Sequence, residues 1–224
     1  MPERPMRDGL RAALFDLDGT LADTAPDLGG ALNRLRAERG LPELPVAAVR
    51  PYASMGARGL LRAGFGLVPE DPAYAEMRDA FLEYYAEHVC ESTQLFPGMA
   101  ELLAAIEARG LAWGIVTNKA ARFTGLIVAA LGLAGRLSCV VSGDTTPHSK
   151  PHPEPLLHAA ACLSLAPGRC CYVGDDLRDI QAAHAAGMRA VAVEYGYHGI
   201  DNGGPRSWGA DAVIAQPLDL LAIL

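Results

Sequence analysis

Two aspartates one residue apart, Asp16 and Asp18, follow the apolar run 13–15 and precede Gly19 and Thr20. Side chains at alternate positions of a strand share a face, so both carboxylates can reach one small volume as the chain leaves the strand. Close carboxylates repel each other, and a hard cation such as Mg²⁺, which prefers oxygen ligands, relieves that repulsion. Gly19 lets the backbone turn sharply near a ligand, and Thr20 adds a hydroxyl. The stretch predicts an acidic, metal-binding turn.

Two further segments place polar groups after apolar runs. Thr117 and Asn118 close one such run, and a hydroxyl with a free backbone N–H at a helix start suits an anion, although a plain helix cap explains them as well. Lys150 lies in a loop stiffened by Pro151 and Pro153. A site with several acids needs a fixed cation before a dianionic ester can enter, and Lys150 can provide that charge.

A last acidic cluster, Asp175, Asp176 and Asp179, follows the apolar residues 170–173. Asp175 and Asp179 are four apart and therefore share one face of a helix's first turn, where acids also stabilise the helix N-terminus. In a parallel sheet, ligands bind beyond the carboxyl ends of the strands. The four segments are therefore expected to converge at one edge of a sheet.

The elements that must position these residues alternate between strands and helices. Helical and strand periodicities predict strands over 11–16, 111–117, 137–142, 169–174, 189–194 and 212–214, and helices over 24–40, 46–51, 57–65, 72–89, 99–108, 123–131, 154–163, 176–186 and 217–224. Strands that alternate with helices imply βαβ units and a parallel sheet. Residues 23–94 contain no convincing strand. We therefore expect an α/β core domain over 1–22 and 95–224, and an all-helical inserted domain over 23–94.

Composition and net charge limit the classes of molecule that the protein is expected to bind. The chain has 224 residues, half of them apolar, and a net charge of −7, which argues against nucleic acid and anionic membranes. It has no apolar run long enough to cross a membrane and no apolar leader, and its five cysteines form no Cys-x-x-Cys pair. We expect a cytoplasmic protein, monomeric or homodimeric. Only Lys119 and Lys150 are lysines among 19 basic residues, and both lie beside the motifs above.

The four segments, in this order, resemble the motifs of the haloacid dehalogenase superfamily, most of whose members are phosphatases. The resemblance implies a Rossmann-like core with a C1-type helical cap over 23–94. It further implies that Asp16 is the nucleophile, forming an aspartyl-phosphate, and that Asp18 is the general acid and base. Lys150 would hold the Asp16 carboxylate and neutralise phosphate charge.

The resemblance also implies binding roles. Thr117, the Asn118 N–H and Thr20 would contact the substrate. Mg²⁺ would be bound by Asp16, by the backbone carbonyl of Asp18 and by Asp175. Asp179 would order a metal-bound water or a neighbouring side chain, and for Asp176 a helix cap, an outer-sphere acid and a metal ligand all stay open.

Alternative chemistries within the superfamily can be weighed by residue type. A halide leaving group needs no acid, so Asp18 favours phosphoryl transfer over dehalogenation. Phosphonoacetaldehyde-type cleavage uses a cap lysine, and residues 23–94 contain none. A β-phosphoglucomutase-type mutase shares both aspartates and stays open, as does a phosphate-binding protein without catalysis, although no catalytic position is missing.

A narrower resemblance concerns the substrate. The stretches 113–119, 174–180, 195–197 and 208–211 resemble the phosphoglycolate phosphatase-like group, which includes N-acetylmuramic acid 6-phosphate phosphatases of peptidoglycan recycling. The expected activity is hydrolysis of a small phosphomonoester, phosphoglycolate first and the amino-sugar phosphate as the alternative. Both compounds carry a carboxylate, which Arg58, in a glycine-flanked loop over 54–59, could bind bidentately; a plain surface arginine explains Arg58 equally well.

Overall fold

A six-stranded parallel sheet forms the centre of the protein in the computed structural model, which describes residues 9–200 and 202–224. The strand order is β5-β4-β1-β6-β7-β8, so β1 lies inside the sheet between β4 and β6. The strands are β1 (Ala12–Phe15), β4 (Ala112–Val116), β5 (Cys139–Val141), β6 (Cys170–Gly174), β7 (Arg189–Val193) and β8 (Ala212–Ile214). Each lies within a predicted strand range, and the predicted α/β fold class with a parallel sheet is confirmed.

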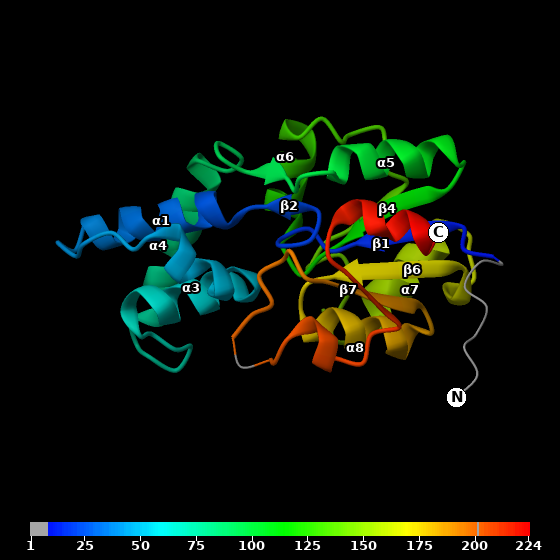
Figure 1. Ribbon diagram of the computed structural model, residues 1–224. Coiled ribbons are helices and arrows are strands. Elements are labelled where there is room, and N and C mark those ends of the chain that lie inside the picture. Colours follow the sequence, from blue (N-terminus) through cyan, green and yellow to red (C-terminus); the bar gives the residue numbers. More distant parts are fainter. Residues whose placement is uncertain (1–8, 201) are drawn as a thin grey trace.

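Helices cover both faces of this sheet (Figure 1). On one face, α5 (Met99–Ala108), α6 (Ala121–Ala130) and a C-terminal 3₁₀-helix (Pro217–Ala222) pack against a core that includes Phe15 and Val173. On the other face, α7 (Glu154–Cys162) and α8 (Leu177–Ala186) pack against the neighbouring positions Leu14 and Tyr172. Alternate strand residues thus face opposite layers, which is why the strands read as continuous apolar runs.

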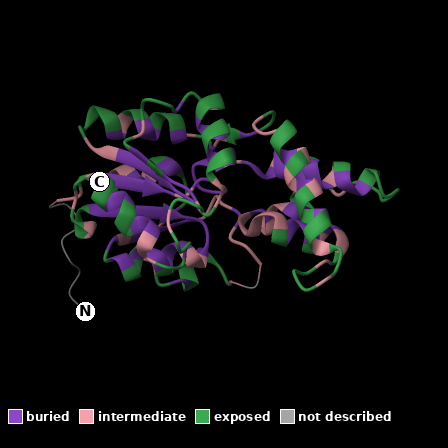
Figure 2. Cartoon of the chain, turned by 180° about the vertical axis from the view of Figure 1, so that it is seen from behind, coloured by how far each residue is buried: buried purple, intermediate pink, exposed green. Residues whose placement is uncertain are grey.

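Residues 24–93 are helical, and their apolar side chains form one buried cluster that also includes Phe96, Phe123 and Tyr197. The helices are α1 (Ala25–Ala37), α2 (Val46–Val49), a 3₁₀-helix (Arg50–Met55), α3 (Gly56–Phe65) and α4 (Tyr74–Glu87). Leu32, Leu60 and Phe81 are fully buried among them. Figures 1 and 2 show this helical segment beside the sheet rather than on either of its faces. Two predicted α-helices differ from the structure: the one over 46–51 ends at Val49, and the one over 217–224 is a 3₁₀-helix over Pro217–Ala222.

Two very short strands that the sequence does not predict join the helical segment to the sheet. β2 (Ala22–Asp23) and β3 (Gln94–Leu95) pair antiparallel where the chain enters and leaves the segment. Two residues are too few for a period of two to be recognised. The expected boundaries at 22/23 and 94/95 fall within this ribbon, and the division into two domains stays a prediction. Among the described residues, no helix is long and apolar enough to cross a membrane.

Candidate active site

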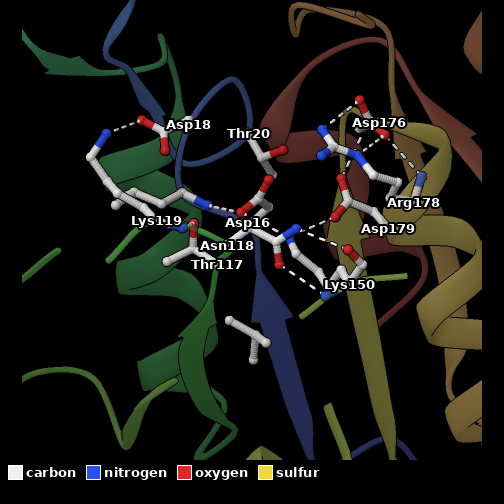
Figure 3. Close-up of polar contacts among 12 residues, drawn as sticks. Asp16, Asp18, Thr20, Thr117, Asn118, Lys119, Lys150, Asp176, Arg178 and Asp179 are labelled. Atoms are coloured by element: carbon white, nitrogen blue, oxygen red, sulfur yellow. Dashed lines mark hydrogen bonds and ion pairs between the residues drawn. The ribbon is translucent and has the colours of Figure 1, made fainter. Parts of the chain in front are cut away.

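A cavity of about 150 Å³ opens beyond the carboxyl ends of β1, β4 and β6, where Asp16, Thr117 and the α8 acids follow their strands. It is lined by residues of the sheet edge and of the helical segment: Asp16, Asp18, Leu28, Ala53, Ser54, Met55, Gly56, Thr117, Asn118, Lys119, Lys150, Asp176, Arg178 and Asp179. Figure 3 shows the polar side chains of this group converging from separate elements. The segments predicted to meet at one edge therefore do meet.

The Lys150 ammonium is fixed by three partners and is almost fully buried. Its Nζ lies 3.0 Å from Asp16 Oδ1 and 2.7 Å from Asp179 Oδ1, and it donates to the Tyr172 hydroxyl at 2.7 Å. The Asn118 side chain holds the Lys150 backbone, donating to its carbonyl oxygen and accepting from its N–H at 2.9 Å each. Burial lowers the pKa of Lys150, but the charges of Asp16 and Asp179 outweigh it and leave this pKa raised. The ammonium therefore stays charged beside the Asp16 carboxylate.

Asp16 itself is held on one of its two oxygens. Oδ1 accepts from the backbone N–H of Leu17 at 2.8 Å and faces Lys150, which fixes the orientation of the carboxylate. The pKa of Asp16 is raised to about 6: burial raises it most, Lys150 lowers it, and the charges of Asp179 and Asp18 add to the rise. Burial and the neighbouring acids thus disfavour the charged form of Asp16 more than Lys150 favours it.

Asp175 lies fully buried beneath the turn that follows β1. Its carboxylate accepts from the Thr20 hydroxyl at 3.0 Å, from the Ser54 hydroxyl at 3.3 Å and from the backbone N–H of Tyr197 at 2.8 Å. Gly19 permits this approach: its φ is +82°, and a Cβ there would lie 2.2 Å from Asp175 Oδ2. Burial and the charges of Asp16 and Asp179 raise the pKa of Asp175 well above its usual range.

Asp16, Asp175 and Asp179 form a cluster that can hold a metal ion. One carboxylate oxygen from each lies within 4.8 Å of the others. The Lys150 ammonium pairs with two of the three, Asp16 and Asp179; burial, and after it the charges of the neighbouring acids, raises the pKa values of Asp16 and Asp175. Oxygen donors of this kind suit a hard divalent cation. Two of the predicted metal ligands, Asp16 and Asp175, are in the cluster, and Asp179 joins them.

The Asp18 side chain belongs to a separate contact on the other side of the cavity. Its Oδ1 lies 2.9 Å from Lys119 Nζ and also accepts from the Thr24 hydroxyl. Lys119 Nζ in turn lies 4.6 Å from the centre of the Tyr85 ring in α4. Burial lowers the pKa of Lys119, but Asp18 and Tyr85 outweigh it and raise this pKa. In the sequence, Lys119 stands out as one of only two lysines, but it has no predicted role. In the structure, its ammonium forms an ion pair with Asp18.

Asp176 caps the helix that carries the last acids. Asp176 Oδ1 accepts from the backbone N–H of Arg178 at 2.9 Å, while Asp179 Oδ2 accepts from the backbone N–H of Asp176 at 3.0 Å. Of the three roles left open for Asp176, the structure shows the helix cap. Its carboxylate also pairs with the Arg178 side chain.

Arg58 is not at the cavity, contrary to the expectation for the substrate carboxylate. It is exposed and lines a separate hollow with Arg62 and Val68. The reason is the direction of α3: the helix buries Leu60 and Leu61, so positions 58 and 62, one turn apart, point to solvent. The guanidinium that does line the cavity is that of Arg178.

Tyr197 is a positioning residue that sequence reasoning missed. Its hydroxyl accepts from the backbone N–H groups of Thr24 and Ala25, at 2.7 and 2.9 Å, where α1 begins, and donates to Asp23 at 2.8 Å. Asp23 also pairs with Arg50 of the helical segment at 2.8 Å. Tyr197 therefore connects Asp175, which accepts from its backbone N–H, to Asp23 of the β2–β3 ribbon. No spacing rule in the sequence points to this role.

A family model, curated relatives and a solved structure all match this chain, and the relatives are named as phosphatases. The family model for haloacid dehalogenase-like hydrolases matches residues 13–193. The chain is 46% identical to an N-acetylmuramic acid 6-phosphate phosphatase of Pseudomonas putida, over 96% of both chains. It is 43% identical to a phosphoglycolate phosphatase of Xanthomonas campestris, over 94% of both. The crystal structure of a predicted phosphoglycolate phosphatase from Haemophilus somnus superposes with a TM-score of 0.84 at 29% identity, covering 96% of this chain and 97% of that one.

Proposed function

This chain belongs to the haloacid dehalogenase-like hydrolase family, and on that premise we propose that it hydrolyses a small phosphomonoester through a phospho-aspartate at Asp16. One observation carries the proposal: a single turn brings Asp16 and Asp18 into one cavity, each against its own lysine. A nucleophile and a separate proton donor are what a two-step displacement at phosphorus requires.

In the first step, the Asp16 carboxylate attacks phosphorus while the bond to the ester oxygen breaks. Asp18 gives its proton to that leaving oxygen. In the second step, Asp18 takes a proton from water, the resulting hydroxide attacks phosphorus, and phosphate leaves with Asp16 restored. The Thr117 hydroxyl and the Asn118 N–H would bind phosphoryl oxygens, and Lys150 would offset their charge.

Mg²⁺ is the metal we propose for the acidic cluster. Asp16 and Asp175, with the backbone carbonyl of Asp18, would hold it, and Asp179 would support it from its place beside Lys150. When bound, it supplies the positive charge that makes a dianionic phosphate ester acceptable among these carboxylates.

The helical segment 23–94 would act as a cap that selects the substrate. Residues 53–56 already form one wall of the cavity, so the leaving group of an ester would meet them. The names of the relatives favour phosphoglycolate or N-acetylmuramic acid 6-phosphate, both acidic phosphomonoesters. Values of kcat/KM measured for both compounds with the purified protein decide between them.

Asp18→Asn is expected to separate the two steps. With an alkyl phosphate, kcat should fall roughly 10²- to 10⁴-fold, because the leaving alkoxide needs the proton. With p-nitrophenyl phosphate the first step needs no acid, so one equivalent of p-nitrophenolate should appear in a burst before turnover stalls. Rapid-mixing absorbance measures the burst. Asp79→Asn, an exposed aspartate of α4, is the matched control. Equal losses on both esters without a burst would contradict the role of Asp18.

Asp175→Asn is expected to abolish the stabilisation of the fold by Mg²⁺. At a hundredfold excess over Kd, a ligand that binds only the native state adds about 2.7 kcal/mol. For a chain of this length that raises Tm by about 5–10 °C. Thermal unfolding with MgCl₂ and with EDTA should show this shift for wild type and Asp79→Asn, and not for Asp175→Asn. An unchanged shift in Asp175→Asn would place the metal elsewhere.

A further inference from the structure

The cavity is lined by three cations, of which Arg178 is the most accessible. Lys119 and Lys150 pair with the aspartates of the proposed reaction, and their side chains are 8% and 3% exposed. The Arg178 side chain is 35% exposed and belongs to the same cavity lining. Both ammonium groups thus pair with the aspartates of the proposed reaction, whereas the Arg178 guanidinium pairs with Asp176, which takes no part in that reaction.

Arg178 is anchored through two of its three guanidinium nitrogens. Nε donates to Asp176 Oδ1 at 2.8 Å and Nη2 to Asp176 Oδ2 at 3.0 Å (Figure 3). Nη2 also donates to the backbone carbonyl of Ser54 in the helical segment at 2.8 Å. No described residue accepts a hydrogen bond from Nη1. The side chain is therefore held in place with one nitrogen left to donate to a ligand.

The charge of the cavity explains why an anionic group of a ligand would need the Nη1 donor of Arg178. Four aspartates and three cations line it, so a second anionic group on a phosphate ester meets a negative surface unless a cation receives it. Burial lowers the pKa of Arg178, but Asp176, Asp179 and Asp16 outweigh it and raise this pKa. The guanidinium is permanently charged, and the two N–H groups of Nη1 can donate to a carboxylate while Nε and Nη2 stay on Asp176 and Ser54.

We propose that Arg178 binds a carboxylate at the non-phosphorylated end of the substrate and so makes the site selective for acidic phosphomonoesters. The inference rests on the proposed phosphatase function and adds the group that reads the substrate. Because Nη2 also donates to the Ser54 carbonyl, the position of Arg178 depends in part on the 3₁₀-helix that carries Ser54. Arg178 thereby takes the place that the sequence assigned to Arg58.

The test compares ester pairs that differ in the carboxylate. One pair is 2-phosphoglycolate and 2-hydroxyethyl phosphate; the other is N-acetylmuramic acid 6-phosphate and N-acetylglucosamine 6-phosphate. Arg178→Met is expected to lower kcat/KM for the acidic member of the preferred pair roughly 10- to 100-fold, mainly through KM, and to change the neutral member little. Each ester is compared with itself across variants, so differences in leaving-group reactivity cancel.

Two further variants keep the test interpretable. Arg62→Met, an exposed arginine of α3, should leave the ratio of acidic to neutral kcat/KM at the wild-type value. Arg178→Lys keeps the charge but cannot hold Asp176 and Ser54 and also donate to a ligand from a separate nitrogen, so it should give an intermediate ratio; circular dichroism and Tm show whether each variant folds. Equal losses on both esters in Arg178→Met would show that Arg178 only fastens the helical segment, which overturns the inference while the phosphatase function stands. If wild type hydrolyses no ester, the proposed function fails and the inference falls with it.

Discussion

Asp16→Asn is expected to reduce turnover of every phosphomonoester by roughly 10⁴-fold or more, because the amide cannot form the acyl phosphate on which both steps depend. The fold should survive the change. Burial raises the pKa of Asp16 to about 6, so its charge is unfavourable where it stands, and a neutral isostere removes that cost. Steady-state phosphate release and thermal unfolding of the same preparation measure the two effects.

A covalent readout separates this role from a purely electrostatic one. Wild type incubated with ³²P-labelled ester and quenched in acid should carry label on the protein, and Asp16→Asn should carry none. Asp79→Asn should behave as wild type in both assays, since that residue is exposed on α4, outside the cavity lining. Retained turnover of Asp16→Asn with added Mg²⁺ would refute the assignment of the nucleophile.

Lys150→Met is expected to damage both activity and stability. Its ammonium is the shared partner of Asp16, Asp179 and the Tyr172 hydroxyl, and its side chain is only 3% exposed. Removing one partner of a buried ion pair typically costs about 3–5 kcal/mol of unfolding free energy. Loss of a preorganised charge at the transferring group costs roughly 10²- to 10³-fold in kcat. Urea unfolding without metal and steady-state kinetics measure these quantities.

A second substitution distinguishes lost charge balance from lost packing. In Lys150→Met/Asp179→Asn, one of the two stranded carboxylates is neutral, so part of the unfolding free energy should return. Turnover should not return, because Asp16 still lacks its cation. If the double variant is less stable than the single one by the full effect of Asp179→Asn alone, the two sites are independent and the buried triad contributes nothing as a unit.

The sheet edge that carries the candidate site was predictable because it depends on strand ends rather than on tertiary packing. A parallel sheet gathers whatever follows its strands, so Asp16, Thr117 and Asp175 could be placed together from periodicity alone. The partners that tune these groups were not predictable. Tyr172, which accepts from Lys150, is an interior residue of β6 and reads as ordinary core. Nothing local distinguishes it from its neighbours.

The error at Arg58 has a similar cause. A glycine-flanked loop that opens a helix does lie at the cavity, since Ser54 to Gly56 line it. Which face of α3 is buried, however, is decided by Leu60 and Leu61 packing inside the helical segment, and that packing turns position 58 outward. Arg178 was missed because its place beside an acidic cluster already explains it as the charge partner of Asp176. The structure shows this ion pair and also places Arg178 at the cavity.

The β2–β3 ribbon holds the two ends of the helical segment side by side. Residues 22–23 and 94–95 pair with each other, so any insert whose two ends meet there closes a loop without changing the strand order. An insert grafted between these positions would keep the strand order, but it would have to replace the contacts that Thr24, Ser54 and Tyr85 make with Asp18, Asp175 and Lys119. The four residues of the β2–β3 ribbon are therefore the positions between which one insert could be replaced by another on the same sheet.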